Sequence, residues 1–184
     1  MAWLTDQNGK LTQGTVIDNV DWGNGVNPLS IVMSNPCDLE YGKASFLLVA
    51  ALIPANNTLQ ITKEFQNKVT SANANKQLSK GSWKALFDYL ASFIHNKNIV
   101  RYFTIDPNEI IDSDVLFVDF QLLKSIPISQ IEGLNLIAQL PSPFVEKMIT
   151  HFASYISRIG VDRVSEERQK TMTIEIASPY HSES

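Results

Sequence analysis

Cys37 stands out in this 184-residue sequence because it is the only cysteine. It lies in the polar connection between two apolar runs of residues 31–55, "IVMSNPCDLEYGKASFLLVAALIPA". A thiol acts as a nucleophile when a histidine serves as its base, and the chain has three histidines: His95, His151 and His181. No local signature of a cysteine hydrolase surrounds Cys37. The favoured interpretation is a small apolar side chain at a turn.

Three carboxylates raise the question of a cation site. Asp38 and Glu40 are two positions apart, so in an extended segment they share a face, and with Asp119 they would offer oxygen ligands to a hard cation. The simpler alternative is turn stabilisation, in which Asp38 accepts backbone N–H groups and Glu40 pairs with Lys43. The second interpretation is favoured, and neither a metal nor a cofactor is predicted.

Asp119 lies inside an apolar stretch, "DVLFVDFQLL", at residues 114–123. A half-buried carboxylate needs a partner, because burial without one costs free energy. Arg101 and Arg158 are the two candidates. We expect a structural ion pair in preference to a catalytic acid.

The composition is that of an ordinary globular protein, with 44% hydrophobic and 18% charged residues. A single cysteine cannot form an intramolecular disulfide, so the chain does not depend on an oxidising compartment. No apolar run approaches the roughly 18 residues that indicate a membrane span. A soluble cytoplasmic protein without membrane association is expected.

Charge is distributed unevenly along the chain. The net charge is −4, but residues 63–101 carry seven basic and two acidic groups. The segments on either side, 1–62 and 102–184, are both acidic. The basic segment is interpreted as a solvated loop and helix face, with a local anion site as the less favoured alternative.

Alternating or continuous apolar patterns predict six strands. These cover residues 14–22, 28–34, 45–53, 99–105, 114–123 and 134–140. In the fifth strand one face is expected to be core and to carry the even-numbered apolar residues: Leu116, Val118, Phe120 and Leu122.

Two amphipathic helices are predicted, at residues 82–98 and 142–160. Ser82 is the expected N-cap of the first. Its apolar residues recur at spacings of three and four, and they are Trp83, Leu86, Phe87, Leu90, Phe93 and Ile94. Before it, residues 67–82 are expected to form an exposed loop. The polar tail contains a brief strand-like run at 172–176.

These elements indicate one domain, a small curled sheet or barrel of the α+β or mainly β class. The barrel core is assigned to residues 14–54 and 99–140. An inserted loop and helix occupy 63–98, the C-terminal helix 142–160, and the tail 161–184.

The segments "GTVIDNV", "NPLSIVMSN" and "FLLVAALI" together resemble the core of the MazF/PemK family, a compact SH3-like barrel. The resemblance covers residues 14–54 and, more loosely, 115–160, where "LIAQLPSPFVEKMITHFASYISRIG" looks like a larger relative. Most members of that family are toxins of toxin–antitoxin pairs that cut single-stranded RNA as dimers. The resemblance therefore implies a prokaryotic toxin–antitoxin or phage-defence context.

The residues that carry the family's chemistry are not matched here. In the ribonucleases an arginine before the proline of the second strand acts on the phosphate, and a Thr or Ser after the third strand assists. The corresponding positions are Asn27 and either Ile53 or Pro54. Loss of such an electrostatic group typically costs about 10²- to 10³-fold in rate. The resemblance thus favours a non-catalytic interaction or accessory module with a protein partner or a homodimer.

Two enzymatic alternatives stay open. An endoribonuclease with relocated groups would use Ser34, Lys43 and Arg101, with RNA as a less favoured partner. A cysteine-dependent hydrolase is the third hypothesis. For a binding site we expect six residues to contribute: Asn35, Cys37, Asp38, Glu40, Asp119 and Arg158.

Overall fold

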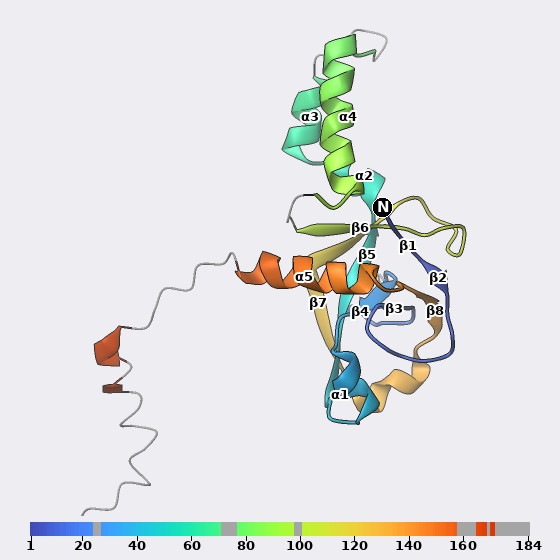
Figure 1. Cartoon of the computed structure of the whole chain (residues 1–184), viewed down its shortest axis with the longest axis vertical. Coiled ribbons are helices and arrows are strands. Elements are labelled where there is room, and N and C mark those ends of the chain that lie inside the picture. The colour runs from blue at the N-terminus through green and yellow to red at the C-terminus, as the bar shows by residue number, and fades with distance from the viewer. Residues whose placement is uncertain (24–26, 71–76, 98–100, 158–164, 169, 172–184) are drawn as a thin grey trace, which may run out of the picture.

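The chain folds as an α+β protein around a nearly closed, mixed eight-stranded sheet (Figure 1). The computed structural model describes residues 1–23, 27–70, 77–97, 101–157, 165–168 and 170–171. The strands are β1 (Ala2–Trp3), β2 (Thr5–Asp6), β3 (Thr15–Ile17), β4 (Ser30–Val32), β5 (Phe46–Pro54), β6 (Tyr102–Asp106), β7 (Leu116–Pro127) and β8 (Leu136–Gln139). The helices are α1 (Pro36–Glu40), α2 (Ala55–Gln60), α3 (Lys63–Val69), α4 (Lys80–Ile94), the 3₁₀ helix η1 (Ile128–Gly133) and α5 (Phe144–Ser157).

The sheet closes through the N-terminal segment. In the strand order β1-β6-β7-β5-β4-β3-β8-β2, the two edge strands are consecutive in the chain and only Leu4 separates them. β1 runs parallel to β6, and β2 runs antiparallel to β8. The Leu4 N–H donates to the Asp106 carbonyl (3.0 Å), and Asn108 Nδ2 donates to the Leu4 carbonyl (3.2 Å). One short segment therefore joins both edges of the sheet.

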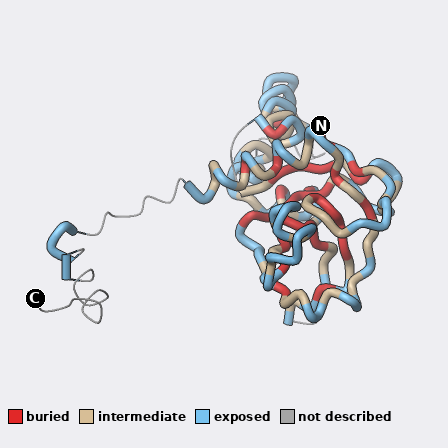
Figure 2. The backbone as a smooth tube through the Cα atoms, turned by 60° about the horizontal axis from the view of Figure 1, so that its bottom comes forward, coloured by how far each residue is buried: buried red, intermediate tan, exposed pale blue. Residues whose placement is uncertain are grey.

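The barrel interior is the main core, and buried positions follow the strands that surround it (Figure 2). Phe103, Ile105 and Leu140 are fully buried there beside Leu4. Helix α5 packs against the same cluster through an apolar stripe that includes Phe144, Met148, Phe152 and Tyr155. The amphipathic pattern at 142–160 predicted this helix, although positions 158–160 lie outside the described residues.

Each of the six predicted strands overlaps an observed one, but β7 departs from strict alternation. Its register against β5 jumps from Ala50↔Leu123 to Ala51↔Asp119, so Phe120, Gln121 and Leu122 have no partner on β5. Such a bulge bends a strand and re-aims its side chains. Leu122 is 42% exposed, so its assignment to the core face was wrong.

The insertion after β5 is more helical than predicted. Residues 67–69 belong to α3, and α4 begins at Lys80 with Ser79 as its cap, which accepts a hydrogen bond from the Ser82 N–H (3.2 Å). The predicted loop at 67–82 was therefore wrong at residues 67–69 and 80–82, and the predicted Ser82 cap was wrong. Residues 71–76 and the strand-like run at 172–176 lie outside the described residues. Helices α3 and α4 form a hairpin that projects from the barrel (Figure 1).

We predict that Leu4→Ala lowers the free energy of unfolding by about 3 kcal/mol, because it leaves a cavity where the sheet closes. Leu122→Ala, the same truncation at the bulge, is expected to cost less than about 1 kcal/mol. Urea unfolding followed by circular dichroism measures both. Equal losses would contradict the role assigned to Leu4.

Candidate interaction surface

Helix α4 presents large apolar side chains to solvent. Trp83, Phe87 and Ile94 are 61%, 62% and 37% exposed. Their spacings of four and seven place them on one face of the helix, together with the half-buried Leu90. We call these four residues the α4 stripe. Several large apolar residues in one exposed row are typical of a docking surface, whereas single scattered apolar residues are common on any protein surface.

A second apolar face explains why α4 folds onto the barrel. Leu86 is buried, and Phe93 and Leu90 pack against a cluster formed by Ala55, Leu59 and Phe117. The Phe93 and Phe117 rings lie 5.9 Å apart. This face anchors the hairpin, and the α4 stripe lies beside it, with Leu90 at the border of the two.

The α4 stripe leads into an apolar cavity at the base of the hairpin. The cavity has a volume of about 120 Å³, and we call it the base pocket. Leu90 and Ile94 form one wall, and the other walls come from α2, β6 and β7, including Leu59, Val115 and Phe117. A partner that covers the stripe could thus place one large apolar side chain in this pocket.

Basic residues flank the stripe. A helix advances about 100° per residue, so Lys80 and Lys84 lie beside Trp83 and Phe87 on the solvent side. Both lysines are exposed and belong to the basic segment 63–101. The surface therefore combines aromatic side chains with positive charge.

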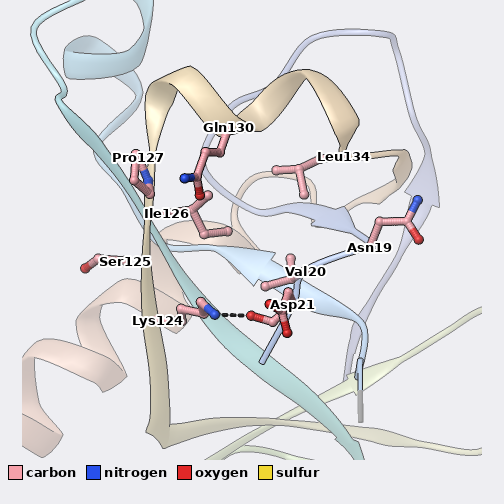
Figure 3. Close-up of a pocket in the computed structure, with 9 residues that line it drawn as sticks. All are labelled: Asn19, Val20, Asp21, Lys124, Ser125, Ile126, Pro127, Gln130 and Leu134. Carbon is pink, nitrogen blue, oxygen red and sulfur yellow. Dashed lines mark hydrogen bonds between the residues drawn. The ribbon is translucent and has the colours of Figure 1, made fainter. Parts of the chain in front are cut away.

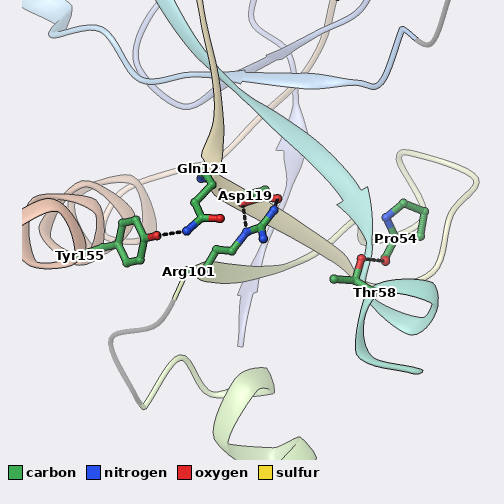
Figure 4. Close-up of polar contacts among 6 residues, drawn as sticks. All are labelled: Pro54, Thr58, Arg101, Asp119, Gln121 and Tyr155. Atoms are coloured by element: carbon green, nitrogen blue, oxygen red, sulfur yellow. Dashed lines mark hydrogen bonds and ion pairs between the residues drawn. The ribbon is translucent and has the colours of Figure 1, made fainter. Parts of the chain in front are cut away.

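A polar cluster lies on β6, β7 and α5 (Figure 4). The buried Asp119 carboxylate accepts hydrogen bonds from Arg101 Nε (2.6 Å) and Nη2, so the pair is bidentate. It also accepts one from the Gln121 N–H (3.0 Å), and Gln121 Nε2 donates to the Tyr155 hydroxyl (2.6 Å). The hydrogen bond and the charge of Asp119 raise the pKa of Arg101 above its usual value. The Arg101 guanidinium is therefore occupied by a structural ion pair.

The other expected partner of Asp119, Arg158, lies outside the described residues. Tyr102 lies beside Arg101, whose guanidinium carbon is 5.0 Å from the ring centroid. Burial raises the pKa of Tyr102, and the nearby Arg101 charge lowers it by less. At neutral pH this tyrosine is therefore uncharged, and its ring covers one side of the ion pair.

The Cys37 region forms the short helix α1 within the β4–β5 hairpin. Asn35 caps this helix by accepting from the Cys37 N–H (2.9 Å), and both Cys37 and Asp38 are exposed. The Asp38 carbonyl accepts from the Lys43 N–H (2.9 Å). Because the segment is helical and not extended, Asp38 and Glu40 point in different directions.

The expected pairing of Glu40 with Lys43 was wrong. Glu40 instead pairs with Lys10 (3.1 Å), and both side chains are more than half exposed. Lys43 Nζ lies 5.5 Å from the centroid of the Tyr41 ring. No group of three His, Cys, Asp or Glu residues able to hold a metal exists within the described part of the chain.

The relocated ribonuclease candidates do not come together. Ser34 accepts a hydrogen bond from the Leu48 N–H (2.7 Å) at the end of β4, next to α1. Arg101 precedes β6, which pairs with residues 116–119 of β7. That part of β7 lies toward the Pro54 end of the β5–β7 ladder, away from Ser34. At the position after β5, the Thr58 hydroxyl donates to the Pro54 carbonyl (2.9 Å; Figure 4).

Comparison with known proteins adds no relative: neither a protein-family profile nor a curated protein sequence matches this chain. Within the described residues, no helix has the length and apolar character needed to cross a bilayer.

The sequence pattern held no signal that separates the stripe from the packing face. The six apolar residues expected on one face of α4 span about 120° of the helix from Phe93 to Phe87. A single core face is at least about 100° wide, so this width is compatible with one buried face. Which of these residues are exposed depends on what α4 packs against.

We predict that Arg101→Leu lowers the free energy of unfolding by about 3 kcal/mol, because it leaves the Asp119 carboxylate buried without a cation. Asp119→Asn should cost less, since Arg101 is partly exposed and can be hydrated. The double variant should recover part of the loss. Urea unfolding near neutral pH tests this cycle, and simple additivity of the two single variants would contradict a coupled pair.

His151 predicts a pH dependence of stability. It is only 9% exposed, its ring lies edge-on to Phe103 (5.5 Å), and burial, aided by the Lys147 charge, lowers its pKa. The folded state therefore holds fewer protons than the unfolded state. This contribution is present above the unfolded pKa of about 6.5 and is lost as pH falls below it.

His151→Phe should make the unfolding free energy less sensitive to pH between about pH 7.5 and 5.5. His95→Gln, at an exposed histidine, is the matched control and should leave the sensitivity unchanged. Urea midpoints at the two pH values measure the effect. An unchanged pH dependence in His151→Phe would contradict the assignment.

Proposed function

We propose that this chain is a MazF/PemK-like, SH3-like barrel without ribonuclease chemistry, acting as a non-catalytic interaction or accessory module. In this proposal the α4 stripe is its docking surface, and a prokaryotic toxin–antitoxin or phage-defence system is its setting. The observation that carries the proposal is the exposed row of Trp83 and Phe87 beside Lys80 and Lys84. Tryptophan and other aromatic anchors dominate the binding energy of protein interfaces.

The stripe and the base pocket together suit a helical partner. Trp83, Phe87, Leu90 and Ile94 present a straight apolar row that an amphipathic helix covers with residues at matching spacing. A volume of about 120 Å³ is of the size that one large aliphatic side chain fills. The pocket then fixes the position of the partner along the row.

Charge selects the partner's chemistry. Lys80 and Lys84 favour acidic residues along the edge of the incoming helix. A second copy is a poorer fit, because it would bring two basic hairpins against each other across the same surface. We therefore assign the surface to an acidic amphipathic helix of another protein.

An endoribonuclease function has less support. Asn27 supplies no cation, and Arg101 is held by the buried Asp119. Phosphodiester cleavage needs a positive group directed at the developing charge. RNA nevertheless shares the preference for basic and aromatic surfaces, so it is the main competing ligand in any test.

Site-specific photocrosslinking tests the docking surface in cells that contain the natural partners. A benzophenone amino acid replaces Phe87 in the full chain, and the control carries it in place of Phe46, a 57% exposed phenylalanine at the α1 end of β5. The Phe87 position is expected to capture one protein with an acidic amphipathic segment. That protein is then purified and its binding to the full chain is measured.

In the purified complex, Trp83→Ala should weaken binding by at least about 30-fold, as truncation of a central tryptophan does. Stability should change by no more than about 0.5 kcal/mol, because the side chain is mostly exposed. Phe46→Ala is the matched control and should bind normally. Lys80→Glu with Lys84→Glu should weaken binding and reduce its salt dependence.

Other outcomes would overturn the proposal. Crosslinks from position 87 to RNA, with RNA cleavage by the purified full chain, would favour the endoribonuclease. Crosslinks only to a second copy of the chain, with a dimer in solution that Trp83→Ala dissociates, would favour self-association. Equal capture from positions 87 and 46 would remove the special role of α4.

A further inference from the structure

A second cavity lies at the other end of the barrel from the α4 stripe. Its volume is about 210 Å³, and it is formed by the loop after β3, the end of β7 and η1 (Figure 3). The β5–β7 ladder runs from Pro54↔Leu116, next to α2, to Phe46↔Pro127, next to this cavity. We call it the Lys124 pocket. It is separate from the surface assigned above.

The pocket has an apolar floor. Val20 and Ile126 are buried, and Leu134 packs against the same core cluster. A planar or branched apolar group can therefore contact a rigid surface there, since these side chains belong to the core. Apolar lining with a few directed polar groups is the usual make-up of small-molecule sites.

Lys124 provides a cation in a pocket that the acidic residue Asp21 also lines. It is half-buried, and its ammonium group donates to the Asp21 carbonyl across the pocket (Figure 3). The Asp21 carboxylate instead accepts the Gly23 N–H (2.7 Å). Within the described residues Lys124 forms no ion pair, although a lysine has three donors. At least one donor is therefore free for a ligand.

Uncharged polar groups complete the rim. The Asn19 and Gln130 amides and the Ser125 hydroxyl line the pocket, and none of them has a side-chain hydrogen bond among the described residues. In Figure 3 the Gln130 amide lies over Ile126, whereas the Asn19 amide and the Ser125 hydroxyl point away from the floor. Gln130 is therefore the rim side chain that offers a hydrogen bond to an anionic group held by Lys124.

From this arrangement we infer that the Lys124 pocket binds a small organic anion, a phosphate or carboxylate carried on an apolar body. The anionic group contacts Lys124 and the rim, and the apolar body covers Val20 and Ile126. The volume limits the ligand to about a dozen non-hydrogen atoms.

Titration of the full chain with phenyl phosphate tests this site, and inorganic phosphate and phenol serve as its two component probes. Backbone amide shifts of Val20, Ser125 and Gln130 in ¹⁵N spectra report binding. Phenyl phosphate should saturate these shifts with a millimolar or lower dissociation constant, and each component should bind at least about tenfold more weakly. Benzoate distinguishes a carboxylate site from a phosphate site.

Variants assign the binding to the pocket. Lys124→Gln should weaken phenyl phosphate binding by about tenfold, the effect expected for a hydrogen bond to a charged group. Lys124→Arg should retain most of it, and Lys97→Gln, an exposed lysine elsewhere, is the matched control. If Lys124→Gln does not fold, Gln130→Ala provides an independent test, and it should also weaken phenyl phosphate binding.

Three results would overturn the inference. One is no saturable shift with either phenyl phosphate or benzoate up to about 20 mM, a concentration well above a millimolar dissociation constant. Another is equal binding of inorganic phosphate and phenyl phosphate, which indicates an adventitious ion only. The third is unchanged binding in both Lys124→Gln and Gln130→Ala.

Discussion

The fold depends on the pairing of residues 2–6 with both edges of the sheet. Without that segment β6 and β8 would each present an unpaired edge, and open edges expose backbone groups to water and to other chains. With it, Leu4 is fully buried, and its N–H and carbonyl are hydrogen-bonded to Asp106 and Asn108 at the end of β6. Closure encloses the apolar cluster and gives α5 a continuous surface to pack on.

The bulge in β7 brings several polar side chains into contact on the outside of the nearly closed sheet. Because β7 skips three residues against β5, Asp119 remains in the ladder opposite Tyr102 while Gln121 leaves it. The Asp119 carboxylate then binds the backbone of Gln121 and the side chain of Arg101 together. The ion pair and the bend in the strand are parts of one arrangement, and Gln121 extends it to α5 through Tyr155.

The two candidate sites occupy opposite ends of the same rigid ladder. At the α2 end, Leu90 and Phe93 pack the base of the hairpin against the barrel, and Trp83 and Phe87 are exposed farther along α4. At the other end, Lys124 lies over a floor of core residues. The ladder holds both surfaces in place, and they do not contact each other.

The sequence by itself determined the local elements. Apolar alternation predicted the strands from β3 to β8, and the 3.6-residue period predicted α4 and α5, because such patterns reflect short-range geometry. It also contained the two possible partners of Asp119, since a carboxylate inside an apolar strand requires one. Only the tertiary structure decided three matters. Residues 2–6 found strand partners more than a hundred residues away, Leu122 left the core at a bulge, and Trp83 remained exposed because Leu90 and Phe93 occupy the packing face. Each of these depends on contacts between distant segments, which no local pattern encodes.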